Sequence, residues 1–193
     1  MFAKSSISAF ALTLTLLAQP ATAGQLEDGV SAVDQHEYVT AIKLLRPLAE
    51  AGNPKAEVYL GAAYTYYNKD FAEALKWYRK AADQGYSDGM LNVGVVYSLG
   101  EGVPHDDAIA VEWYRRAAEL GNSGGQSELG FAYKDGVGVA QDFVQAYMWY
   151  NVAATQYSIY GEIREDLSKK MTAQQIAKAQ ELSRNWLTAH PKN

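Results

Sequence analysis

The three histidines are the first side chains to consider for chemistry, because imidazole binds metal ions and transfers protons near neutral pH. His36, His105 and His190 are far apart, and none stands at metal-ligand spacing from another histidine or a carboxylate. His105 precedes two aspartates, but the corresponding segment 36 residues later has glutamine in place of the histidine and keeps one aspartate. The sequence therefore predicts no metal ion and no cofactor.

Two Gly-x-Gly sequences, at residues 100–102 and 136–138, could be taken for phosphate-binding loops. Both follow helical patterns rather than strands, and no Lys-Ser or Lys-Thr pair comes after them, so a structural turn is favoured. The chain also has no cysteine. Ser168, Lys169 and Lys170 have the wrong spacing for a Ser-x-x-Lys motif. We predict no catalytic residue and a protein that is not an enzyme.

These glycines and aspartates recur as part of an internal repeat of 36 residues. Residues 87–122 and 123–158 are identical at 13 of the 36 aligned positions, without a gap. A third copy, 53–86, lacks three residues of the connecting loop and its Gly-x-Gly, and residues 24–52 form a degenerate copy that we expect to cap the N-terminal end. A fixed period of this length indicates a stacked array of one structural unit.

Each unit has the pattern of two antiparallel helices. In the copy 87–122, Val93, Gly94 and Tyr97 share one helix face, and the glycines and proline of 100–104 then interrupt the helix. Asp106 is placed to cap a second helix. The apolar stripe of that second helix consists of Ala110, Trp113, Tyr114, Ala117 and Ala118. We expect an all-α fold in which Trp113 and Tyr114 fill the space between units.

These residues resemble the Sel-one-like repeat family, relatives of the tetratricopeptide repeat. The match runs from Asn92 to Gly121 and again from Glu128 to Ala154. The resemblance implies a right-handed α-solenoid of antiparallel helix pairs that acts as a protein-interaction scaffold. Because some cysteine-rich members are linked to β-lactam binding or hydrolysis, a cell-wall ligand-binding or hydrolytic, β-lactamase-like protein is the alternative.

The resemblance also implies where a partner would bind. In tetratricopeptide-like stacks the first helix of each unit lines the concave side, so a peptide or a partner helix would bind there. The positions that would face this groove are Lys55, Val58, Ala62, Thr65, Tyr66, Asp88, Leu91, Val95, Ser98, Ser127, Phe131 and Lys134. For the apolar members, packing against the next helix is an equally good interpretation.

The two ends of the chain differ from the repeats. Lys4, the apolar run 7–18 and the small residues of 21–23 have the pattern of a secretory signal peptide, which we assign to residues 1–23. Thr172 and Gln175 predict a capping box that begins a helix. We expect the helices of 159–193 to cover the last unit.

Charge and export together limit the class of partner. The formal net charge is −5 and no basic cluster is present, which disfavours nucleic acid and anionic membranes. No apolar stretch after the signal peptide is long enough to span a membrane. We therefore expect a periplasmic or secreted protein that binds a protein or peptide partner in the cell envelope.

Overall fold

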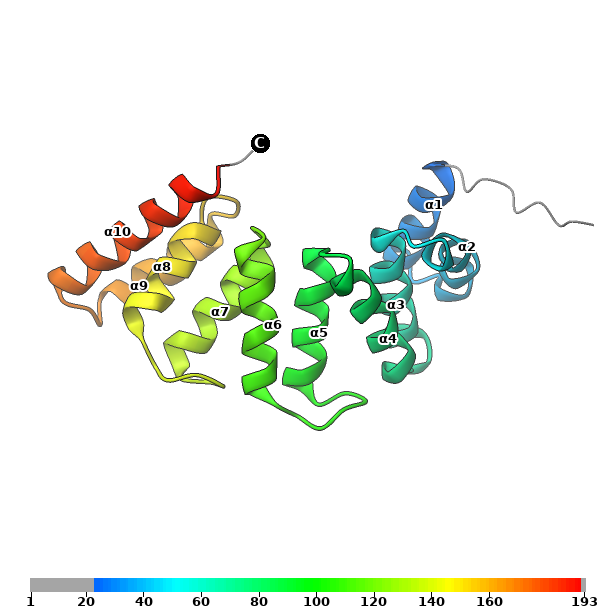
Figure 1. Cartoon of the computed structure of the whole chain (residues 1–193), viewed down its shortest axis with the longest axis horizontal. Coiled ribbons are helices and arrows are strands. Elements are labelled where there is room, and N and C mark those ends of the chain that lie inside the picture. The colour runs from blue at the N-terminus through cyan, green and yellow to red at the C-terminus, as the bar shows by residue number, and fades with distance from the viewer. Residues whose placement is uncertain (1–22, 192–193) are drawn as a thin grey trace, which may run out of the picture.

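The computed structural model describes residues 23–191, and within this range the chain is all-helical with no strand. Figure 1 shows the helices in a shallow arc, with α5 and α6 near its middle and with α1 and α10 at its two ends. The helices are α1 (Ala23–Asp34), α2 (Tyr38–Glu50), α3 (Pro54–Asn68), α4 (Phe71–Asp83), α5 (Ser87–Leu99), α6 (Asp107–Glu119), α7 (Ser123–Asp135), α8 (Phe143–Ala153), α9 (Ile159–Ser168) and α10 (Ala173–Ala189). The predicted all-α solenoid is confirmed.

Aspartate side chains begin the second helix of each repeat. Asp70 Oδ1 accepts a hydrogen bond from the backbone N–H of Glu73 at 3.1 Å, and Asp106 Oδ1 accepts one from Ile109 at 3.0 Å. Asp142 Oδ1 accepts two, from the N–H groups of residues 144 and 145. Each carboxylate satisfies donors that the first helical turn leaves free, so the aspartates are structural caps.

Left-handed residues end the first helix of each repeat. Gly100 and Gly136 end α5 and α7 with φ of 68° and 72°. In the copy with the shortened loop, Lys69 ends α3 with φ of 57°, a conformation that glycine adopts more readily. The connections between α5 and α6 and between α7 and α8 lie on the same side of the arc (Figure 1).

The two helices of each repeat pack through a glycine on the first helix and a tyrosine on the second. The pairs are Gly61 with Tyr78, Gly94 with Tyr114 and Gly130 with Tyr150. Tyr114 is buried, as expected, but Trp113 is only half-buried against the core. The guanidinium carbon of Arg116 lies 4.1 Å from the centre of the Trp113 ring, so this indole packs beside the apolar stripe rather than inside it.

The C-terminal helices pack onto the last repeat. The Thr172 side chain accepts from the backbone of Gln175, whose side chain accepts from the backbone of Thr172, which is the predicted capping box. The Trp186 ring of α10 meets the Trp149 ring of α8 edge-on, with 5.8 Å between the ring centres. Thus α10 closes the open side of α8.

The predicted signal peptide falls almost entirely on residues 1–22, which lie outside the described residues. Within the described part, no helix combines the length and the apolar character that crossing a membrane requires.

Candidate partner-binding groove

Two clefts open between successive repeats, and they are built from the same repeat positions. The cleft between the first two repeats has a volume of about 350 Å³, and the next has about 180 Å³. The residues Thr65, Tyr78 and Val95 of the larger cleft occupy the positions of Ser98, Tyr114 and Phe131 in the smaller one. The clefts are therefore a product of the stacking itself.

Two further clefts extend the series to the ends of the stack. At the N-terminal end a cleft of about 430 Å³ is lined by Tyr66, which also lines the next cleft, and by Val33, Asp34, His36 and Tyr38. At the C-terminal end a cleft of about 250 Å³ lies between Lys134 of α7 and Asp166 of α9. We number the four clefts one to four from the N-terminal end and call the row the groove.

Half of the predicted partner-binding residues line the groove. They are Thr65, Tyr66, Val95, Ser98, Phe131 and Lys134. All six lie in the C-terminal halves of α3, α5 and α7, where the first helices of the repeats approach the connecting loops. The other six lie nearer the middle or the N-terminal halves of the same helices and line none of the four clefts: Lys55, Val58, Ala62, Asp88, Leu91 and Ser127.

For Val58 the packing interpretation holds, since its side chain is 8% exposed and belongs to the core. Leu91 is half-buried and packs toward Gly124 of the next first helix. Asp88 accepts a hydrogen bond of 2.6 Å from Asn122 Nδ2 in the next inter-unit turn. These contacts hold neighbouring units together. The N-terminal halves of the first helices therefore pack against the next unit.

The groove also contains residues outside the predicted set. Leu99 lines cleft two with 61% of its surface exposed, and it occupies the repeat position of Tyr66. Tyr38 lines cleft one, and its ring is stacked on that of Tyr66 with 6.0 Å between the centres. The repeat alignment of Leu99 with Tyr66 was the signal that could have identified it.

Burial shifts the titration of the two tyrosines that line clefts two and three. It raises the pKa of Tyr78 and of Tyr114 to about 12 in each case. The Tyr114 hydroxyl donates a hydrogen bond of 3.0 Å to Ser98 Oγ. Burial also raises the pKa of the Glu128 carboxyl group in cleft three.

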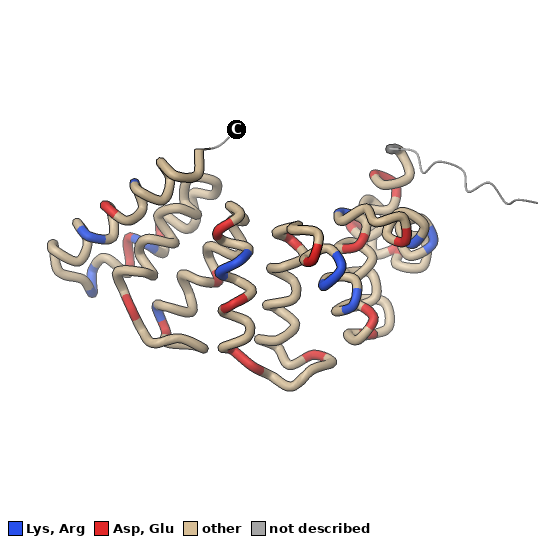
Figure 2. Tube along the Cα trace, in the orientation of Figure 1, with Lys and Arg blue, Asp and Glu red and all other residues tan. Residues whose placement is uncertain are grey.

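The groove presents hydroxyl groups, apolar surface and charged side chains of both signs. Among residues 23–191, no group of three or more His, Cys, Asp or Glu side chains could hold a metal ion. Figure 2 shows Lys and Arg interspersed with Asp and Glu along the stack, without a continuous basic stripe. This surface is suited to binding side chains rather than phosphates.

Comparison with known proteins gives the family. The pattern described as “Sel1 repeat” matches residues 54–86, 87–122 and 123–158, more than half of the 193-residue chain. Residues of the chain are also 45% identical, over 51 residues, to a Helicobacter pylori protein named “Putative beta-lactamase HcpC”. That match covers 26% of this chain and 17% of the Helicobacter protein.

Solved structures agree with this assignment. A protective antigen of uropathogenic Escherichia coli with an SLR fold is 37% identical, has a TM-score of 0.73, and is matched over 77% of this chain and 33% of its own. A Sel1 repeat protein from Oxalobacter formigenes is 30% identical with a TM-score of 0.59, over 66% of this chain and 54% of its own. The chain thus spans about a third and about half of these two proteins. It belongs to the Sel1 repeat family.

Proposed function

We propose that the protein is an exported, non-catalytic scaffold whose groove binds an extended peptide or a helix of a cell-envelope protein. The observation that carries the proposal is the row of four clefts along successive repeats, two of them built from equivalent positions. Repeats of this family commonly mediate protein interactions, and a chain with regularly placed side chains can fill one cleft after another.

The clefts differ in chemistry along the groove. Tyr38 and Tyr66 give cleft one an aromatic wall, and Val95 and Leu99 add apolar surface in cleft two. In cleft three the carboxylate of Glu128 is partly desolvated, which a basic group of a partner would offset. Cleft four has charged residues of both signs, including Lys134 and Asp166. A partner would therefore place apolar side chains toward α1 and polar ones toward α9.

Export is the second component of the proposal. It is supported by the basic residue, apolar run and small residues of 1–23, which together have the pattern of a cleaved secretory signal. An envelope partner follows from that location. Detection of the mature protein in the periplasmic fraction or the medium, with Gly24 as its first residue, would test it.

Site-specific photo-crosslinking in cells tests groove binding. Replacing Leu99 with p-benzoylphenylalanine places the probe in cleft two, and the same replacement at Val39, 62% exposed and outside the four clefts, is the matched control. We expect one envelope protein to crosslink from position 99 and not from position 39. Equal products from the two positions, or none from either, would contradict groove binding.

A hydrolytic function is the second candidate, favoured by the match to the Helicobacter protein whose name includes beta-lactamase. That match spans 26% of this chain, which itself contains no cysteine. Incubation of the purified mature protein with the chromogenic cephalosporin nitrocefin tests the candidate directly. Sustained turnover would favour the hydrolase, and absence of turnover leaves the scaffold.

A further inference from the structure

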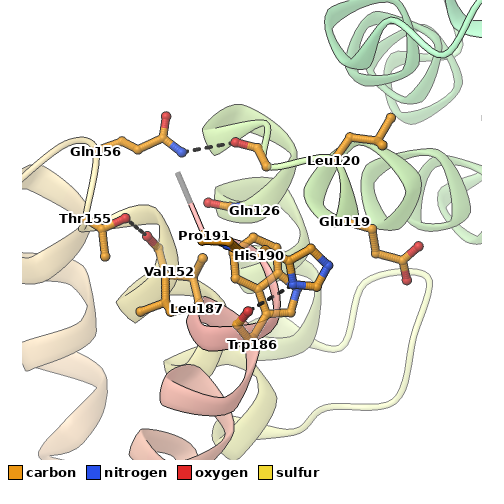
Figure 3. Close-up of a pocket in the computed structure, with 11 residues that line it drawn as sticks. Glu119, Leu120, Gln126, Val152, Thr155, Gln156, Trp186, Leu187, His190 and Pro191 are labelled. Atoms are coloured by element: carbon orange, nitrogen blue, oxygen red, sulfur yellow. Dashed lines mark hydrogen bonds between the residues drawn. The ribbon is translucent and has the colours of Figure 1, made fainter. Parts of the chain in front are cut away.

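A second cavity lies at the edge of the stack away from the Gly-x-Gly loops. It has a volume of about 550 Å³ and shares no lining residue with the groove. The inter-unit turn at 119–121, α7, the end of α8 with the residues after it, and the C-terminal end of α10 form its walls (Figure 3). The C-terminal end of α10 thus supplies one wall of this cavity.

An unpartnered acceptor lines this cavity. The Gln126 side chain has no exposed surface, and its Nε2 donates to the carbonyl oxygen of Ala118 at 3.3 Å. Its Oε1 has no hydrogen-bond partner among the described residues. An unpaired buried amide oxygen is unfavourable, so a donor that entered the cavity and reached this oxygen would recover free energy.

The equivalent position in the first repeat shows how the acceptor is otherwise satisfied. There Glu57 takes the place of Gln126, and its Oε2 accepts a hydrogen bond of 2.6 Å from Gln84 Nε2. The third repeat keeps the donor as Gln156, but its Nε2 donates to the Gly121 carbonyl at 3.0 Å instead (Figure 3). The third repeat thus has both partners of the pair and leaves the acceptor open.

The other walls indicate what kind of donor fits. Trp186 and His190 are stacked with 4.2 Å between ring centres, and Leu120 is 56% exposed beside the cavity. Glu119 is the charged residue of the lining, and among the described residues no Lys or Arg lines it. Aromatic and aliphatic walls, an open acceptor and one carboxylate favour a cation on an apolar stem.

We propose that this cavity binds a guanidinium or ammonium group carried on a short apolar stem. Gln126 Oε1 would accept a hydrogen bond from one N–H group of that cation. An arginine or lysine side chain of a peptide and a free alkylamine share this chemistry. The site is separate from the groove, so this proposal can be tested independently of the function proposed for the groove.

Titration followed by nuclear magnetic resonance tests the proposal on the full mature chain. The probes are n-butylguanidinium and, as the neutral control, n-pentanol; the signals are the Gln126 side-chain amide and the Trp186 indole N–H. We expect n-butylguanidinium to shift both signals and to bind at least about tenfold more tightly than n-pentanol, since hydrogen bonds to charged groups are the stronger ones. Equal affinities, or no shift at about 20 mM, would overturn the proposal.

The variant Gln126→Met removes the acceptor and copies Met90, which occupies this repeat position in the second repeat and is buried there. We expect Q126M to keep the helical circular dichroism and to weaken n-butylguanidinium binding at least about tenfold. Tyr66→Ala, in the groove, should leave that affinity unchanged. Undiminished binding by a folded Q126M would refute the role of Gln126.

A third probe, N-acetyl-arginine methylamide, separates the two sources of the cation. Tighter binding than n-butylguanidinium would assign the site to a peptide side chain, and equal binding would assign it to the cationic group alone. Both results support the proposal, whereas failure of both cations to bind would contradict it even if the groove binds its partner.

Discussion

Gly94→Ala tests whether the glycine–tyrosine contacts set the distance between helices. A Cβ atom on Gly94 would lie 2.6 Å from Tyr114 Cε1 and 2.7 Å from Cδ1. Carbon atoms at their best separation are about 3.5–4.0 Å apart, so the ring or the helix must move by about 1 Å. The ring is held at its far end by the 3.0 Å hydrogen bond from the Tyr114 hydroxyl to Ser98, which restricts the direction in which it can move.

The expected magnitude follows from two opposing contributions. Overpacking a core costs about 1–3 kcal/mol, and disturbing the Tyr114 hydroxyl adds about 1 kcal/mol. Replacing glycine by alanine inside a helix returns about 1 kcal/mol. We therefore expect G94A to lower the free energy of unfolding by about 1–3 kcal/mol.

Gly130→Ala is the matched control, because the same repeat position is more open there. Its Cβ would lie 3.1 Å from the nearest atoms of Tyr150, so a shift of a few tenths of an ångström suffices. The helix-propensity gain then offsets most of the strain, and we expect a change within about 1 kcal/mol of wild type.

Urea unfolding followed by circular dichroism compares the two variants, and hydrogen exchange shows where each one loosens. We expect faster exchange in α5 and α6 of G94A and little change in α7 and α8 of G130A. A G94A protein as stable as wild type, or a G130A protein less stable than G94A, would refute the argument that these contacts set the helix spacing.

Two further predictions concern buried aromatic residues. Trp149→Ala should cost about 3–5 kcal/mol in urea unfolding, because its ring is buried and contacts Trp186, and the half-buried Trp113→Ala should cost less; equal losses would contradict this order. Because burial raises the pKa of Tyr78 and Tyr114 from 10.0 to about 12, the unfolded chain releases their protons first as the pH rises. The stability that they contribute is present below pH 10 and should be lost between about pH 10 and 12. Y114F should lose less stability than wild type over this range in alkaline urea titrations, and an equal loss would contradict the assignment.

Much of the fold could be predicted because the repeat reports tertiary contacts. Gly94 and Tyr114 recur at the same positions in each clear copy, and residues in contact across two helices must be kept together in every unit. Trp113 recurs as well, yet Arg116 covers its ring and the side chain remains half-buried. The recurrence of a residue type therefore identified the packing positions. It did not specify how deeply each side chain is buried.

The site was predicted less well because helix faces were assigned from a single geometry for the whole helix. The contact between Leu91 and Gly124 and the hydrogen bond between Asp88 and Asn122 bring the N-terminal halves of neighbouring first helices into contact. Most cleft-lining residues of the first helices therefore lie in the C-terminal halves, where Leu99 is exposed, whereas Val58 in the N-terminal half of α3 is buried. The open acceptor on Gln126 depends on the direction of one glutamine side chain, which no sequence pattern encodes.

The differences between copies bear on what the groove binds. Positions that hold the stack are the same in each repeat, such as the glycines at 61, 94 and 130 and the tyrosines at 78, 114 and 150. Positions on the first helices nearer the groove vary: Ala62, Val95 and Phe131 are equivalent, as are Thr65, Ser98 and Lys134. A polymer of identical units would be matched best by identical clefts, whereas a polypeptide offers a different side chain at each step. Unlike clefts on a uniform scaffold therefore favour a peptide partner over a polysaccharide made of one repeating sugar unit.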